Sequence, residues 1–311
     1  MNLALHRSPL QRLSPSLDGI AFHHESRPDD DQQFALQWLG TAGFRLQLHG
    51  RHLWFDPHLS RHSLAELAFG KIAPVTSRVL AQVDAADGVL VGHSHFDHAI
   101  DAPVLAQHFG AQVYGAADTL TYCRGQGVPE AQLHLLAGDL ATHALGPFEI
   151  GARRSVHSPF ALGHVPFPGQ ILKQFQVPAH ASAWRVGQVL IPHVTAAVAA
   201  GQRVTIAHVG SAALIDAELR GLQADIVLAC TIGRHATPNF THRLLDALAP
   251  KLVVPCHWDQ FWRPIDAPVR QIPSNDLAGF LMEVAAHRSA PRVRVLPILG
   301  WTTLADAIDA R

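Results

Sequence analysis

The feature that most restricts how this chain can fold is the segment HSHFDH at residues 93–98, which directly follows a short apolar run. The apolar run predicts a buried strand, and α/β sheets place their binding sites beyond the C-terminal ends of strands. On a tight loop, His93 and His95 can converge on one ion. Asp97 and His98 then point to a neighbouring position about 3.5–4 Å away, the usual spacing of a two-metal centre. The segment therefore predicts a metal site; the alternative is a set of solvated polar side chains on a surface loop.

The composition is that of a globular protein with an excess of one metal-binding side chain. Histidine occurs 22 times, and it is the residue that both binds metals and titrates near neutral pH. Hydrophobic residues make up 48% of the 311 residues and charged residues 16%, which excludes a disordered chain. With a formal charge of −1, the chain has no net positive charge with which to bind nucleic acid or an anionic membrane. No nucleic-acid partner is therefore expected.

Cysteine usage and apolar run lengths indicate the compartment. Cys123, Cys230 and Cys256 are widely spaced and form no CxxC pair, so neither a disulfide framework nor a zinc ribbon is suggested. No apolar run approaches the roughly 18 residues of a membrane span, and the N-terminus lacks the apolar core of a signal peptide. We therefore expect a cytoplasmic protein without a transmembrane segment.

The order of apolar and polar runs predicts an α/β fold. Residues 1–34 are expected to form an N-terminal extension and residues 35–311 a single domain, in which two sheets are covered by helices. Residues 158–182, rich in Pro, Gly and Phe, are expected to form a loop or lid. The expected strands are 34–38, 43–48, 52–55, 88–91, 204–207, 225–229, 251–254 and 292–296, and the expected helices include 78–83, 102–109, 240–248 and 302–310.

The segment at residues 93–98 resembles the HxHxDH signature of the metallo-β-lactamase fold superfamily of metallohydrolases. Residues 38–44 resemble the opening strand pair of the branch that contains ascorbate-6-phosphate lactonase and N-acylphosphatidylethanolamine phospholipase D. Residues 55–57, Phe-Asp-Pro, match an early strand-end Asp of that branch, and residues 254–258 match its closing Pro-x-His-Trp element. The resemblance implies a four-layer αβ/βα sandwich of two mixed β-sheets flanked by helices.

The resemblance also implies six metal ligands in two groups. One group would be His93, His95 and His157, and the other Asp97, His98 and His257. Three imidazoles, or two imidazoles with a carboxylate, suit Zn²⁺ with a position left for water, and Mn²⁺ or Fe²⁺ can take the same donors. Asp56 is a candidate acceptor for the free N–H of a ligating imidazole, and Asp259 is a weaker candidate.

One position departs from the superfamily pattern. Most members carry Gly-Asp at a strand-end turn whose carboxylate bridges both ions, whereas this chain has Gly210-Ser211-Ala212. Two alternatives follow: two ions held without the bridge, or a single ion because the second position is weakened. Ser211 and His208 are possible stand-ins at the bridging position; for His208, a strand histidine satisfied by a neighbour is the alternative.

Together these features predict a metal-dependent hydrolase. Metal coordination lowers the pKa of bound water from about 15.7 to about 7, and the hydroxide can then attack an ester, a lactone or a phosphodiester. The expected partner is a small-molecule or lipid-like substrate. Asp97 would hold metal and also orient the nucleophile or protonate the leaving group. No GxSxG, P-loop or strand-framed GxGxxG is present, so nucleophile-elbow, NTPase and dinucleotide-binding functions have no support.

Substrate contacts and two competing functions stay open at this level. Arg234 and His235 follow a buried strand and are candidates for binding a phosphate or carboxylate; an ordinary surface charge fits Arg234 equally well. One competing function is an iron-dependent oxidoreductase that resembles the sulfur dioxygenases of the same fold. The absence of the bridging carboxylate leaves this function open. The other is a substrate-binding protein with a partly decayed metal site, although the six candidate ligands argue against it. The sequence does not define the oligomeric state.

Overall fold

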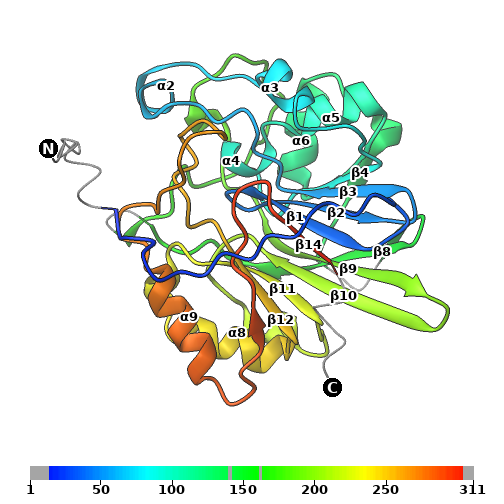
Figure 1. The fold of residues 1–311 in the computed structure, drawn as a ribbon. Coiled ribbons are helices and arrows are strands. Elements are labelled where there is room, and N and C mark those ends of the chain that lie inside the picture. The colour runs from blue at the N-terminus through cyan, green and yellow to red at the C-terminus, as the bar shows by residue number, and fades with distance from the viewer. Residues whose placement is uncertain (1–13, 139–141, 161–162, 304–311) are drawn as a thin grey trace, which may run out of the picture.

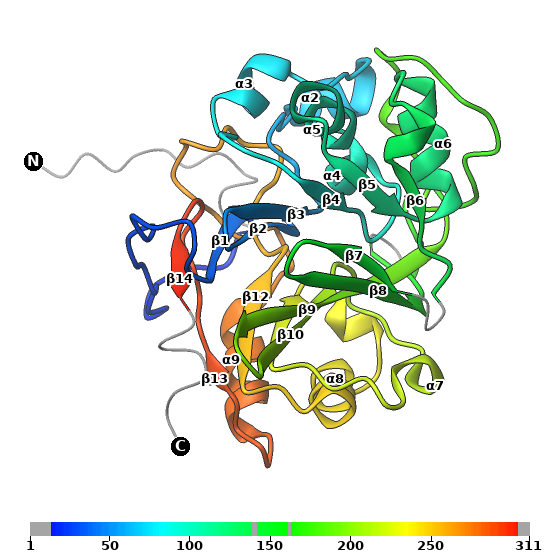
Figure 2. The ribbon, with the colours of Figure 1, turned by 90° about the vertical axis from the view of Figure 1, so that its right-hand side faces the viewer.

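The alternating apolar runs of the chain form two β-sheets that face each other. The computed structural model describes residues 14–138, 142–160 and 163–303. Figures 1 and 2 show that helices cover the outer side of each sheet, so the described residues stack in four layers. The predicted α/β sandwich of two mixed sheets is confirmed.

The first sheet has seven strands in the order β14-β1-β2-β3-β4-β5-β6. The strands β14 to β3 pair antiparallel, and β3 to β6 pair parallel. The strands predicted at 34–38, 43–48 and 52–55 are therefore observed as the antiparallel strands β1, β2 and β3. The bounds are β1 Ala35–Gly40, β2 Gly43–Leu48, β3 Arg51–Phe55, β4 Gly88–Leu90, β5 Gln112–Gly115, β6 Leu133–Leu135 and β14 Trp301–Thr303.

The second sheet also has seven strands, in the order β13-β12-β11-β10-β9-β8-β7. Here β7 to β10 pair antiparallel, and β10 to β13 pair parallel. Parallel strands send their C-terminal ends to one edge, which is where this sheet contributes to the site. The bounds are β7 His143–Leu145, β8 Phe148–Ser155, β9 Val189–Ala199, β10 Gln202–Val209, β11 Ile226–Cys230, β12 Leu252–Cys256 and β13 Arg292–Val293.

The helices divide between the two outer layers. In Figure 2, α2 to α6 lie on the outer side of the first sheet, and α7 to α9 lie on the outer side of the second. The bounds are α2 Leu64–Phe69, α3 Thr76–Leu80, α4 Phe96–Ala99, α5 Ala102–Phe109, α6 Ala117–Gly125, α7 Asp216–Leu219, α8 Phe240–Leu248 and α9 Leu277–Ala286, with 3₁₀ turns at Glu130–Gln132, Ala181–Ala183 and Arg234–Ala236. None of the described helices is both long and apolar enough to cross a membrane.

The main core lies between the two sheets. Alternate residues of β2, such as Phe44 and Leu46, point into it and are fully buried. Trp38 of the first sheet and Trp258, just after β12, pack with ring centroids 4.8 Å apart and ring planes tilted by 32°. Each sheet buries one face in this core. The strand ends that carry the polar site residues are therefore held in fixed positions relative to one another.

Several predicted boundaries differ from those observed. Of the predicted strand at 292–296, only Arg292–Val293 forms a strand of the sheet, and the predicted helix at 78–83 is observed as Thr76–Leu80. The predicted helix at 302–310 is wrong at its start, because Trp301–Thr303 pairs with β1; residues 304–311 lie outside the described residues.

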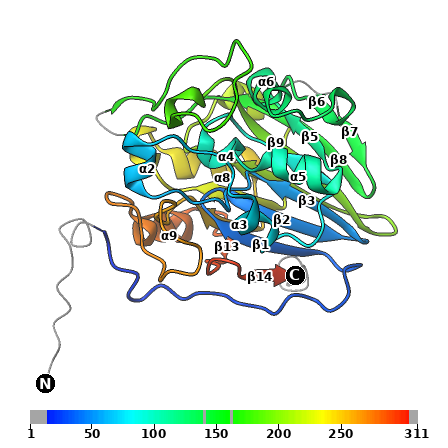
Figure 3. The ribbon, with the colours of Figure 1, turned by 90° about the horizontal axis from the view of Figure 1, so that it is seen from above.

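The described part of the N-terminal segment lies along the edge of the fold. Figure 3 shows it running past β14, and isolated bridges join Phe22 to Val295 and Glu25 to Trp301. Residues 1–13 lie outside the described residues. The assignment of residues 1–34 as an extension stays a prediction.

Candidate metal centre

The candidate ligands come from loops at the ends of strands in both sheets and from the short helix α4, which holds Asp97 and His98. His93 follows β4, His157 follows β8 and His257 directly follows β12. His257 has a φ of 57° and Asp56, directly after β3, a φ of 41°. Left-handed backbone is unfavourable for residues other than Gly and is typically tolerated at functional sites. The surrounding sheets therefore hold these two turns in place.

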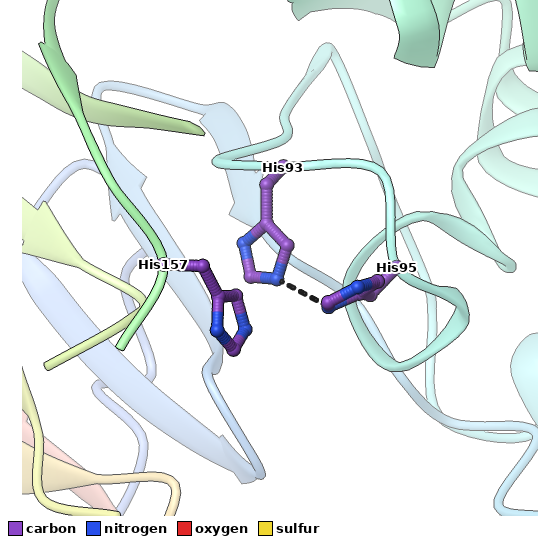
Figure 4. Close-up of side chains that lie close together, drawn as sticks. All are labelled: His93, His95 and His157. Carbon is purple, nitrogen blue, oxygen red and sulfur yellow. Dashed lines mark hydrogen bonds between the residues drawn. The ribbon is translucent and has the colours of Figure 1, made fainter. Parts of the chain in front are cut away.

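The first group of candidate ligands is His93, His95 and His157. One nitrogen of each ring lies within 4.8 Å of the corresponding nitrogens of the other two. Nε2 of His93 lies 3.1 Å from Nδ1 of His95. Figure 4 shows the three imidazoles converging, two from the loop after β4 and one from the loop after β8.

The second group is Asp97, His98 and His257, whose ligand atoms also lie within 4.8 Å of one another. Oδ2 of Asp97 lies 3.2 Å from Nε2 of His257 and 3.7 Å from Nε2 of His98. The rings of His93 and His98 have centroids 3.8 Å apart, so the two groups are neighbours. The structure thus brings all six residues together in the division expected from the sequence, and their role as ligands stays a prediction.

Outer partners select the tautomer of three of these imidazoles. His95 donates from Nε2 to the carbonyl of Pro166 at 2.8 Å, and His157 donates from Nδ1 to the carbonyl of Ser158 at 2.7 Å. His98 donates from Nδ1 to Oδ2 of Asp56 at 2.6 Å. In each ring the other nitrogen keeps its lone pair and faces the cluster, which is the arrangement found in metal-ligating histidines. The donor set therefore fits a metal ion.

Burial keeps the first group neutral. Removal from water lowers the pKa of His95 to about 4 and that of His157 to about 3, and it holds the pKa of His93 well below its ordinary value. Although burial opposes ionisation of Asp97, the neighbouring His98 and His257 hold the pKa of that carboxyl well below its usual range. Neutral imidazoles and an ionised carboxylate are the forms that bind metal ions.

Asp56 and Asp259 differ in how they support the site. Asp56 is fully buried and accepts the N–H of His98, as expected. Asp259 forms a buried ion pair with Arg61 at 2.9 Å and accepts the backbone N–H of Thr41 at 2.6 Å. The carbonyl of Thr41 in turn accepts the backbone N–H of His257 at 2.7 Å. Asp259 therefore acts on the turn that carries His257, and no described hydrogen bond joins it to a candidate ligand's ring.

The bridging position holds Ser211, whose Oγ accepts the backbone N–H of Ser158 at 3.0 Å. His208 donates from Nε2 to the carbonyl of Ala42 at 2.8 Å and belongs to neither ligand group. This position favours the alternative of a strand histidine satisfied by a neighbour. No carboxylate of the described residues joins the two groups here, so each group depends on its own three donors.

The structure directs Arg234 away from the candidate site. Its buried guanidinium pairs through Nη2 with Asp276 at 3.1 Å and Glu283 at 3.3 Å, and the His235 side chain is 62% exposed. Neither Arg234 nor His235 lines the cavity beside the ligands. Two carboxylates, Asp276 and Glu283 on the α9 side, engage the guanidinium, and a role of Arg234 and His235 in substrate binding stays a prediction.

A cavity of about 300 Å³ opens onto both ligand groups. Sequence reasoning missed several residues that line it, among them Leu64 and Leu67 of α2, and also Phe261 and Ile272. A local signal for α2 was present, since Ser63 and Glu66 form a capping box at its start. For Phe261 and Ile272 no local pattern indicates a place beside residues 93–98.

Comparison with known proteins identifies the family. A family model described as a beta-lactamase superfamily domain matches residues 51–258, and the chain belongs to this superfamily. The UPF0173 metal-dependent hydrolase MK1542 of Methanopyrus kandleri is 25% identical over 242 residues, which cover 76% of this chain and 87% of that protein. The chain matches other curated relatives over only about a third to a half of their length, such as one from Polynucleobacter asymbioticus, 34% identical over 99 residues.

Solved structures of the same fold are similar over most of the chain. Igni18, a metallo hydrolase from Ignicoccus hospitalis, has a TM-score of 0.53 and 19% identity, covering 87% of this chain and 98% of that one. The metallo-beta-lactamase fold protein YhfI from Bacillus subtilis has a TM-score of 0.52 and 14% identity, covering 87% of this chain and 99% of that one. The superfamily and its fold are thus confirmed, and the branch stays a prediction.

Proposed function

We propose that this protein is a metal-dependent hydrolase that holds one ion in each ligand group. The observation that carries the proposal is the pair of buried three-donor groups, His93, His95 and His157 beside Asp97, His98 and His257, that open on one cavity. Family membership and the relatives named metal-dependent hydrolases support it.

Zinc is the ion that these donors suit best. The first group offers three neutral imidazole nitrogens, and the second offers two imidazoles and a carboxylate; both sets are typical of zinc, although manganese and iron bind the same donors. When bound, such ions supply a Lewis acid and a water whose pKa is lowered to about 7. The three cysteines are free, buried thiols, which supports a reducing, cytoplasmic location.

The chain's own residues then position and exchange protons. In hydrolysis a water oxygen forms a bond to the acyl carbon or phosphorus, the bond to the leaving oxygen breaks, and one water proton moves to that oxygen. Asp97 lines the cavity and is held ionised, so it can accept this proton and pass it on. Cys230 also lines the cavity, but burial raises the pKa of its thiol far above neutrality, which argues against a cysteine nucleophile.

The test combines metal analysis with a hydrolysis panel. Protein prepared without added metal is assayed for bound elements, stripped with a chelator, and reloaded before incubation with lactones, aryl esters, aryl phosphodiesters and β-lactams. We expect zinc to be bound and hydrolysis to need it. The variant His95→Ala should lose metal and activity, whereas His164→Ala, an exposed histidine of the neighbouring loop, should keep both. Stoichiometric iron with oxygen uptake and no hydrolysis would overturn the proposal.

A further inference from the structure

The cavity has a polar floor and apolar walls. Its polar lining is confined to candidate ligands and two hydroxyls, those of Ser158 and Ser211. The large side chains that form the walls are apolar: Leu64, Leu67, Phe160, Phe167, Phe261 and Ile272. Among the described residues, no Lys or Arg lines the cavity. A substrate that fills it would meet charge only at the floor.

Two arginines that flank wall segments in the sequence, Arg61 and Arg234, are engaged by carboxylates. Arg61, which precedes α2, is buried in its pair with Asp259. Arg234, which follows β11, is buried against Asp276 and Glu283. The Arg61 guanidinium is not available to a second anion without leaving the buried Asp259 carboxylate unpaired, and the buried Arg234 guanidinium already has two carboxylate partners. The walls therefore offer no counter-charge to an anionic substrate.

Two of the wall residues, Leu64 of α2 and Phe160, expose apolar surface that no described element covers. Leu64 of α2 is 42% exposed and Phe160 is 41% exposed, although both are large hydrophobic residues. No residue of the six-residue helix α2 is buried, so this helix contributes little to the core. Leu64 and Phe160 line the same cavity as Asp97. Such surface, next to convergent polar groups, is typical of a pocket for an apolar ligand.

We propose that the substrate is a neutral carboxylic ester or lactone whose apolar acyl part fills this cavity. The inference rests on the proposed hydrolase function and narrows it, because the walls are apolar and a charged group remote from the scissile bond, such as a carboxylate at the end of the acyl chain, would lie against Leu67 and Phe167 without a partner. Each methylene that enters an apolar pocket strengthens binding roughly fourfold. Hydrolysis here adds water across the acyl C–O bond, and it releases a carboxylic acid and an alcohol, or one hydroxy acid from a lactone.

The experiment compares substrates on the zinc-loaded full chain. p-Nitrophenyl acetate, butyrate and hexanoate measure the effect of acyl length, and bis(p-nitrophenyl) phosphate measures tolerance of an anion. We expect kcat/KM to rise roughly fourfold per methylene while the chain stays inside the cavity, and the phosphodiester to be at least 100-fold poorer than the hexanoate. If hydrolysis needs the metal but kcat/KM is higher for the phosphodiester, or does not change with acyl length, this inference is overturned and the proposed hydrolase function stands. Absence of metal-dependent hydrolysis from both panels would overturn the proposed function itself.

Variants of the walls localise the effect. Phe160→Ala should lower kcat/KM for the hexanoate about 10-fold and leave that for the acetate within about twofold, because only the longer chain reaches the wall. Leu67→Lys should make kcat/KM higher for the phosphodiester than for the hexanoate, because the lysine supplies a cation in the wall. Phe69→Ala is the matched control, since Phe69 is 87% exposed and does not line the cavity. Equal losses in Phe160→Ala and Phe69→Ala would contradict the proposed wall.

A binding measurement gives a readout that needs no turnover. Chelator-treated protein is titrated with the neutral fluorophore N-phenyl-1-naphthylamine, and nonanamide, a neutral acyl amide, is used to displace it. We expect binding to weaken several-fold in Leu67→Lys and to stay unchanged in Phe69→Ala. If Leu67→Lys binds the fluorophore as well as the unaltered chain does, the cavity is not the apolar site proposed here.

Discussion

Nδ1 of His98 lies 2.6 Å from Oδ2 of Asp56, and both side chains are almost completely removed from solvent. The other oxygen of Asp56 accepts the backbone N–H of Gly92 at 2.6 Å. One carboxylate at the end of β3 therefore holds the start of the HSHFDH loop and also orients an imidazole at its end. Although burial opposes it, Asp56 and Asp97 raise the pKa of His98, which strengthens the imidazole as a donor.

Replacement of this carboxylate should weaken metal binding. For Asp56→Asn we expect the metal dissociation constant to rise about 10–100-fold, the usual effect of removing such an outer partner, measured by competition with a chromophoric chelator. Asp101→Asn is the control, because Asp101 is a buried carboxylate that accepts the N–H groups of Leu59 and Ser60 and contacts no candidate ligand. Equal affinities of Asp56→Asn and the unaltered chain would contradict the assigned role.

The two ligand groups should lose metal separately. Because no described carboxylate joins the groups, we expect His157→Ala and His257→Ala each to retain about one equivalent of metal where the unaltered chain binds two. Elemental analysis after equilibrium dialysis measures the stoichiometry. If either substitution removes all of the metal, the protein holds a single ion, which is the other alternative raised by Ser211.

Arg234 should contribute to stability rather than to substrate binding. We expect Arg234→Met to lower the free energy of unfolding by about 1.5–3 kcal/mol, the range for hydrogen bonds to charged groups, because Glu283 and Asp276 lose their partner. The KM for ester substrates should not change. Arg243→Met is the control: its ion pair with Asp216 is largely exposed, so a loss below about 1 kcal/mol is expected. Urea denaturation gives the stabilities, and a raised KM in Arg234→Met alone would restore this residue as a substrate contact.

Stability of the metal-free protein should fall on acidification. The folded chain holds the pKa of His95 at about 4 and that of His157 at about 3, whereas the ordinary value is 6.5. Between these values the unfolded chain binds more protons, so stability decreases as pH falls from about 6.5 towards 4. From pH 8 to pH 5 this amounts to about 2 kcal/mol for each histidine. Urea denaturation across this range measures it, and His157→Gln should show a shallower slope; an unchanged slope would contradict the lowered pKa.

Much of the site followed from local sequence because its ligands are clustered or lie at strand ends. Residues 93–98 supply four candidate ligands on one short segment, His93 and His95 before α4 and Asp97 and His98 within it. His257 follows β12 in the parallel part of the second sheet, and His157 follows β8, which pairs antiparallel with its neighbours. The division into two groups came from the family resemblance, and the geometry agrees with it.

The sequence by itself determined the alternation of strands and helices, because this depends on residue periodicity, and its resemblance to the superfamily supplied the six candidate ligands. Only the tertiary structure decided the ion-pair partners of Arg234, because Asp276 and Glu283 lie more than 40 residues further along the chain, on or beside α9. It also decided that Trp301–Thr303 forms a strand, because pairing with β1 overrides a local helical pattern. The apolar cavity also depends on the tertiary structure. Its walls come from α2, the loop around Phe160 and residues after β12, and only packing of the two sheets places these segments over the candidate metal centre.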